Sequence, residues 1–126
     1  MPAAYDYAIV RWVPRVDRGE QINVGIVAYC PAHDVIACHL ELDQARAHAL
    51  APAANLADVQ RHLAAMTAVC RGDATGGQIA MLPNKERFHW LVHPKSAGLQ
   101  VSDVHAGTTD DLGRTVQELF ARLVRP

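Results

Sequence analysis

The first third of the chain has the hydrophobic pattern of β-strands. Residues 5–13 are rich in β-branched and aromatic residues on both alternating faces, which predicts a central strand ending at Pro14. Two further strands are predicted over residues 20–30 and 35–42, with a turn between them at residues 31–34. Because the connections are short, we expect an antiparallel meander.

Within the second predicted strand, the even positions from Ile22 to Ala28 are expected to form one apolar face. Asn23 and Gly25 interrupt this strand on the other face. A glycine inside a strand indicates either a β-bulge or a close approach of another backbone.

The hydrophobic spacing then changes to three and four residues, which is typical of helices. Asp43 is expected to cap a short helix, and Asn55 a longer helix that ends at Gly72. A final helix is expected after a cap at Thr108 or Thr109.

Residues 87–93 are predicted to form a fourth strand, because apolar and polar residues alternate there. The side chains expected in the core are Phe88, Trp90 and Val92. A break at residues 94–98 and a weaker strand over 99–104 complete the order β-β-β-α-α-β-β-α. The sequence therefore predicts an α+β fold: a mostly antiparallel sheet of about five strands with helices packed on one face.

Composition favours one soluble domain spanning residues 1–126, with hydrophobic residues making up 50% of the chain. The net charge of −1 supplies no field that would attract nucleic acid, so nucleic-acid binding is the least favoured function. We expect a cytoplasmic protein without membrane contact, since no secretory signal or long apolar segment is apparent. Three cysteines without close spacing indicate reduced thiols rather than a disulfide framework.

Residues that bind anions or move protons are concentrated near the fourth predicted strand. Arg87, Lys95 and Ser96 are candidate ligand-binding residues, and His105 is a candidate catalytic residue that could move a proton. For Arg87, a structural ion pair is an equally reasonable interpretation.

Further candidate ligand-binding residues are Arg11, Glu20, Asn23 and Ser102. Arg11 lies inside an apolar strand, so it needs a carboxylate or a ligand as partner if it is buried. We predict neither a metal nor a cofactor, since the histidines and cysteines lack the spacing of a metal site and no phosphate-binding loop is present. No nucleophile motif is present either, which favours a role other than catalysis.

Several motifs resemble a small bacterial family of unknown function, DUF3037. They are Tyr5-Asp6-Tyr7-Ala8-Ile9-Val10-Arg11, Arg18-Gly19-Glu20, Asn23-Val24-Gly25-Ile26, Leu42-Asp43-x-Ala45-Arg46, Arg87-Phe88-x-Trp90-Leu91-Val92-x-Pro94-Lys95-Ser96 and Gln100-x-Ser102-x-Val104-His105-x-Gly107. The family tends to have Arg-Ser-Thr where this chain has Lys95-Ser96-Ala97, and a lysine lacks the bidentate fork of arginine.

The resemblance implies a cytoplasmic domain that is often encoded beside a HipA-like kinase, without an established activity. Our first hypothesis is therefore an interaction or regulatory module, whose partner is a HipA-like kinase or a second copy of the chain. The alternative is a small enzyme or binder of a phosphate-containing ligand, in which Arg87 and Lys95 hold the anion and His105 moves a proton.

Overall fold

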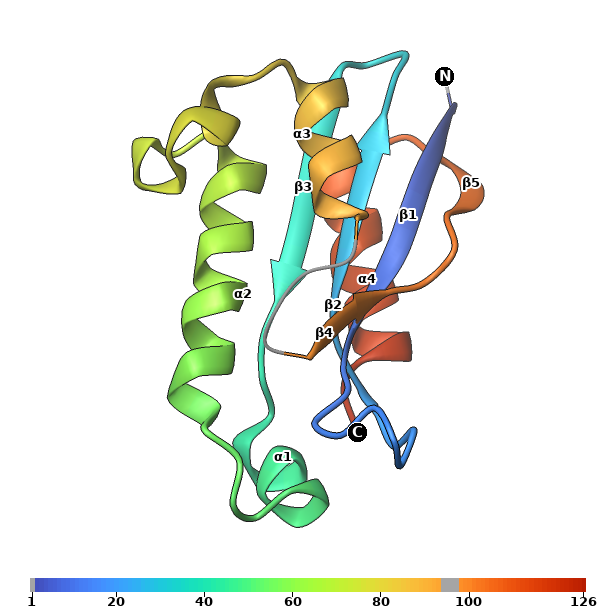
Figure 1. Cartoon of the computed structure of the whole chain (residues 1–126). Coiled ribbons are helices and arrows are strands. Elements are labelled where there is room, and N and C mark those ends of the chain that lie inside the picture. The colour runs from blue at the N-terminus through green and yellow to red at the C-terminus, as the bar shows by residue number, and fades with distance from the viewer. Residues whose placement is uncertain (1, 94–97) are drawn as a thin grey trace.

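The computed structural model describes residues 2–93 and 98–126 as a sheet with helices on both faces (Figure 1). In chain order, the elements are β1 (Ala3–Trp12), β2 (Ile22–Cys30), β3 (Val35–Leu40), α1 (Gln44–Leu50), α2 (Leu56–Arg71), two short 3₁₀ turns (Ala74–Gly76 and Gln78–Met81), α3 (Asn84–Leu91), β4 (Leu99–Val101), β5 (His105–Thr109) and α4 (Leu112–Leu123). The sheet is antiparallel and five-stranded, in the order β3-β2-β1-β4, with β5 also paired to β1. The predicted α+β class and the antiparallel sheet are confirmed.

A β-bulge changes which residues of β2 face each layer. Val10 lies opposite Gly25 but Arg11 lies opposite Asn23, so Val24 is an extra residue in the β2 strand. Val24 packs towards α2, whereas Ile26 and Ala28 pack towards α4. The single apolar face predicted for the even positions is therefore wrong. The indication of a bulge from the glycine is confirmed.

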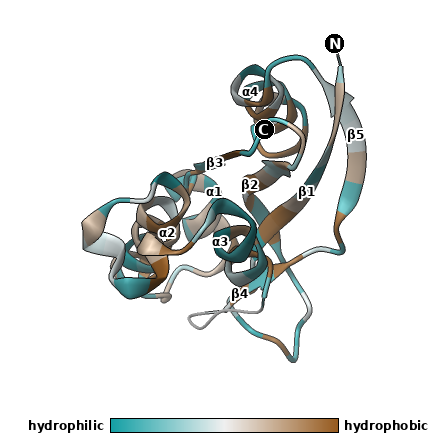
Figure 2. Ribbon diagram, turned by 90° about the horizontal axis from the view of Figure 1, so that it is seen from above, coloured by the Kyte–Doolittle hydropathy of each residue, from teal (hydrophilic) through white to brown (hydrophobic). Residues whose placement is uncertain are grey.

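Two hydrophobic clusters lie on opposite faces of the sheet. One includes Trp12 and Phe88 and joins the sheet to α2 and α3, and the other includes Ile26 and Phe120 and joins it to α4. Figure 2, which views the sheet from above, shows α4 on one side and α2 with α3 on the other. The expectation that the helices pack on one face is wrong, because β1 and β2 carry apolar residues on both of their faces.

The first two helices begin and end as the sequence predicts. The Asp43 side chain accepts a hydrogen bond from the Arg46 N–H, and the Asn55 side chain accepts one from the Asp58 N–H. Gly72 ends α2 in the left-handed conformation, with φ at 68°.

Residues 84–91 form helix α3, so the strand predicted over 87–93 is wrong. Pro83 comes directly before the first helical residue, where a missing N–H costs nothing. Phe88 and Leu91 are buried three residues apart on one side of the helix. The strand was predicted because Phe88, Trp90 and Val92 occupy alternate positions. The spacing of three between Phe88 and Leu91, which is typical of a helix, was the better signal.

Of the weaker strand predicted over 99–104, only residues 99–101 form a strand, β4, and β5 begins after it at His105. The two strands pair with different parts of β1. Val10 to Trp12 pair with β4, and Ala3 to Tyr7 pair with β5. Five strands are thus present, although the fourth and fifth both come from the segment after residue 98. The final helix is capped by Asp111 rather than by a threonine.

Candidate functional site

Arg87 binds the C-terminal end of α2. Its Nε donates to the Leu82 carbonyl oxygen at 2.8 Å, and its Nη1 donates to the carbonyl oxygens of Val69 at 3.0 Å and Cys70 at 2.8 Å. Its Nη2 donates to the Asn84 side-chain oxygen. The last carbonyl groups of a helix lack intrahelical partners and carry partial negative charge, so a cation stabilises them. Arg87 therefore holds α2 and α3 together.

The structure does not bring Arg87 and His105 together. His105 begins β5, and its ring centroid lies 5.3 Å from that of Tyr7, which packs at the α4 cluster. Arg87 contacts α2 on the other face of the sheet. Lys95 and Ser96 lie outside the described residues. The phosphate-site hypothesis therefore gains no support from the placement of its residues.

Arg11 and Asn23 do lie together, beside the C-terminal end of α4. The Arg11 Nε donates to the Asn23 Oδ1 at 3.3 Å, and the Asn23 Nδ2 donates to the Leu123 carbonyl oxygen at 2.9 Å. From α1, the Arg46 Nη1 donates to the Val124 carbonyl oxygen at 2.9 Å. These three side chains connect the sheet and α1 to the end of α4, which is a structural role.

Replacing Asn23 by alanine is expected to lower the free energy of unfolding by about 1–2 kcal/mol, because it removes two partly buried hydrogen bonds. Urea denaturation monitored by circular dichroism measures this change. Gln21→Ala, at an exposed position two residues earlier, is the control and should leave the midpoint unchanged. Equal midpoints for Asn23→Ala and the wild type would show that these bonds contribute nothing.

The two remaining described candidates also have partners within the chain. Glu20 accepts a hydrogen bond from the Arg18 Nε, and this bond holds the pKa of Glu20 below its usual range. The Ser102 hydroxyl oxygen accepts from the Ile9 N–H at 2.8 Å and donates to the Asp103 carbonyl oxygen at 2.9 Å. Ser102 thus continues the hydrogen bonding of β1 where β4 has ended.

Two adjoining concave features with polar side chains lie along the free edge of β3. Hollows of about 360 Å³ and 320 Å³ flank this edge and share several lining residues. We call the region where they meet the β3-edge groove. It is defined by Leu40, Glu41, Thr67 and Arg71, which line both hollows, together with Cys38 and Gln117, which line the smaller one. The groove is bounded by α2 on one side and, through Gln117, by α4 on the other.

The backbone of β3 presents unpaired groups to this groove. The Glu41 N–H donates to the Val24 carbonyl oxygen at 2.8 Å, towards β2. Because successive residues of a strand direct their N–H groups to opposite sides, those of Ile36, Cys38 and Leu40 point away from β2. Among the described residues, β3 pairs with β2 alone. Its outward amides therefore have no partner strand within the described part of the chain.

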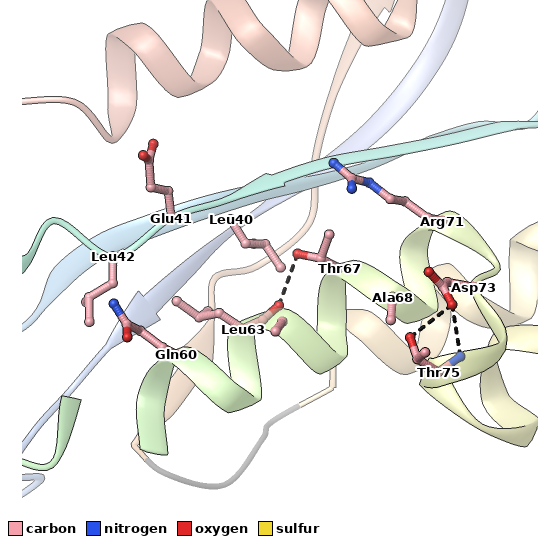
Figure 3. A pocket seen from close by; sticks show the side chains of 11 residues that line it. Leu40, Glu41, Leu42, Gln60, Leu63, Thr67, Ala68, Arg71, Asp73 and Thr75 are labelled. Carbon is pink, nitrogen blue, oxygen red and sulfur yellow. Dashed lines mark hydrogen bonds between the residues drawn. The ribbon is translucent and has the colours of Figure 1, made fainter. Parts of the chain in front are cut away.

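Charged side chains stand at both ends of the groove. Arg71 is exposed and has no hydrogen bond or ion pair with any residue in the described ranges. Figure 3 shows its side chain extending from α2 beside β3. Glu41 is also exposed, with its Oε2 3.4 Å from the His39 Nε2. A ligand in the groove would meet the Arg71 cation at one end, where Asp73 also lines the larger hollow, and the Glu41 carboxylate at the other.

The groove was not predicted from the sequence, although one signal for it lies in β3. Residues 35–40 contain no Lys, Arg, Asp, Glu or Pro, whereas edge strands are usually protected by such residues. The position of β3 at the edge follows from the order of all the strands, which includes the pairing of β1 with the distant β4 and β5. The absence of protection therefore became informative only once the strand order was known.

Membrane and metal sites find no support in the described part of the chain. No helix within residues 2–93 and 98–126 has the length and apolar character required to cross a membrane. Within the same ranges, no group of His, Cys, Asp and Glu side chains is arranged to hold a metal ion.

Comparison with known proteins identifies the family of this chain. A family model described as "Protein of unknown function (DUF3037)" matches residues 7–124. The chain therefore belongs to this family, as its motifs predict. No curated protein and no solved structure shows a significant match.

Proposed function

We propose that this protein is an interaction module that binds an extended segment of a protein partner along the free edge of β3. One observation carries the proposal: β3 is an edge strand without charged residues, its outward amides have no partner strand among the described residues, and it borders the β3-edge groove. Addition of a strand to an exposed sheet edge is a common mode of peptide recognition, in which backbone hydrogen bonds supply affinity and pockets for alternate side chains supply specificity.

The other edge of the sheet is less suited to this role. It consists of β4 and β5, which have 3 and 5 residues and are separated by residues 102–104. β3 offers 6 continuous residues. Very short edge strands discourage pairing with another chain, which favours β3 as the binding edge.

The charges at the groove indicate the chemistry of the bound segment. Arg71 is free to pair with an acidic side chain, and Glu41 favours a donor or a basic side chain at the opposite end. The near-neutral charge of the chain also suits a protein partner better than a nucleic acid. We take a HipA-like kinase as the first partner to test, because the family resemblance implies that the two are often encoded together.

The binding surface can be tested by hydrogen exchange on the purified chain mixed with purified HipA-like kinase. We expect a complex at micromolar concentration in which the amides of Ile36, Cys38 and Leu40 exchange more slowly than in the free chain. No complex, or protection confined to other strands, would contradict the proposal. Slower exchange of the same amides with rising concentration of the chain alone would instead identify a second copy as the partner.

Charge reversal at the groove provides a second test of the same surface. Arg71→Glu is expected to weaken the complex at least about tenfold, because it places a carboxylate where an acidic partner residue would lie. Arg114→Glu reverses an exposed arginine on α4 that lies outside the groove, so its affinity should remain that of the wild type. Equal affinities for the two variants, measured by calorimetry, would exclude an acidic contact at Arg71.

A further inference from the structure

We propose that Cys38 is a site of reversible oxidation by hydroperoxides, and that Cys70 resolves the oxidised form into a Cys38–Cys70 disulfide. This inference does not depend on the proposed binding function. It rests on the contact between the two thiols and on the opening beside one of them.

The two cysteines meet where β3 packs against the last turn of α2. Both are free thiols, and Cys38 packs against the hydrophobic cluster that contains Cys70, where the two thiols interact with each other. Cys70 is buried, with 3% of its surface exposed, and belongs to the core cluster against which Cys38 packs. Cys38 is only partly buried and lines the smaller hollow of the β3-edge groove, so a small oxidant can reach it. The pair therefore combines an accessible thiol with a protected one.

The surroundings favour the thiolate form of Cys38. The interaction with the Cys70 thiol lowers the pKa of Cys38. Burial acts in the opposite direction, and the Arg71 guanidinium and the Thr67 hydroxyl add to the lowering, so the net effect is a lowered pKa. The same interaction, together with burial, raises the pKa of Cys70. Glu41, which directly follows β3, and His39 of β3 also line the hollow. One thiol is thus prepared as the nucleophile while the other keeps its proton.

The chemistry balances with a hydroperoxide, ROOH, as the oxidant. The Cys38 thiolate attacks the peroxide, an S–O bond forms as the O–O bond breaks, and the alcohol ROH leaves after taking up a proton, which yields a sulfenic acid. The Cys70 sulfur, losing its proton, then attacks the sulfenic sulfur and releases water. Two thiols and one hydroperoxide become a disulfide, an alcohol and water.

Cys30 provides an internal control. It lies on β2 in the α4 cluster, on the other face of the sheet, with none of its surface exposed. Burial in apolar surroundings makes a thiol unreactive. The inference therefore distinguishes two cysteines that react together from a third that does not.

The test is oxidation of the reduced, full-length chain with stoichiometric hydrogen peroxide at neutral pH. We expect the loss of two of the three free thiols, with a Cys38–Cys70 linkage in the peptide map and an unchanged signal for Cys30. In Cys70→Ser, dimedone should trap a sulfenic acid on Cys38. The Cys30→Ala variant should behave as the wild type. Iodoacetamide should alkylate Cys38 with a midpoint below about pH 8.5, the value of an ordinary thiol, and Arg71→Gln should raise that midpoint.

Three results would overturn the inference. They are retention of all three thiols, oxidation of Cys30 at the rate of Cys38, and the formation of only intermolecular disulfides. Because Cys70→Ser alters a buried position, its thermal unfolding must first show that the variant is folded. If it is not, the peptide map of the wild-type chain decides the question alone.

Discussion

Replacing Gly25 by alanine is expected to lower the free energy of unfolding by about 2–4 kcal/mol. A Cβ atom on this residue would lie 2.2 Å from the Leu40 Cδ2 and 2.7 Å from the His39 carbonyl oxygen. The leucine side chain can rotate away, but the carbonyl belongs to the hydrogen-bonded ladder between β2 and β3. The strands would therefore have to separate to admit one methyl group.

Denaturant unfolding of Gly25→Ala and Gly113→Ala would check this expectation. Gly113 lies in α4, where an added Cβ would meet only the Asp111 Oδ1 at an ordinary distance of 3.5 Å, so alanine should be neutral or stabilising by up to about 1 kcal/mol. Adding Leu40→Ala to the first variant removes the closest contact but leaves the carbonyl clash, and should restore little stability. A Gly25→Ala protein as stable as the wild type would mean that β3 shifts without cost.

Replacing Arg87 by alanine is expected to cost about 2–4 kcal/mol of stability, because the carbonyl groups of Val69 and Cys70 lose a charged donor at the end of α2. Arg87→Lys should recover only part of the loss, since an ammonium group cannot span the same acceptors. Arg61→Ala, on the exposed side of α2, is the control and should change stability by less than about 0.5 kcal/mol.

The same variants distinguish a structural arginine from an anion ligand. A structural role predicts a lower melting temperature for Arg87→Ala, with no change in the response of the chain to added inorganic phosphate. A ligand role predicts an unchanged melting temperature and the loss of stabilisation by phosphate. The second pattern would revive the phosphate-binding alternative.

The parts of the fold that depend on local signals could be predicted from the sequence. The first three strands and the caps of the first two helices follow from alternation, turn residues and the side chains of Asp43 and Asn55. The bulge in β2 could be anticipated from Gly25, but the change in which side chains face each layer of the fold could not. One extra residue reverses the faces of all those that follow, and an unaligned sequence does not reveal which partner lies opposite.

α3 was missed because two patterns coincide in one segment. Phe88, Trp90 and Val92 alternate as in a strand, while Phe88 and Leu91 have the spacing of a helix. Tertiary contacts favour the helix, since Arg87 reaches the end of α2 from it. A short apolar run is often compatible with both structures, and its outcome then depends on packing.

The sequence could suggest which residue types bind ligands, but it could not show which of them lie together. The polar candidate residues were chosen by residue type and motif, yet Arg11, Asn23 and Arg87 donate to groups within the chain. The β3-edge groove and the Cys38–Cys70 pair combine residues of β3 with residues of α2 and, for the groove, with Gln117 of α4, all distant in the sequence. Long-range contacts of this kind have no local signature.

The pairing of β1 with β5 has a consequence for folding. Ala3 lies opposite Thr109, so the first strand acquires its last partner only after more than a hundred residues have been synthesised. Until then its outer side is open, and closure of so long a loop carries a large entropic cost. The meander and α2 can form early from local contacts, whereas completion of the sheet awaits the C-terminal segment. Folding should therefore be slow for a chain of this size, with the unpaired side of β1 as its most aggregation-prone surface.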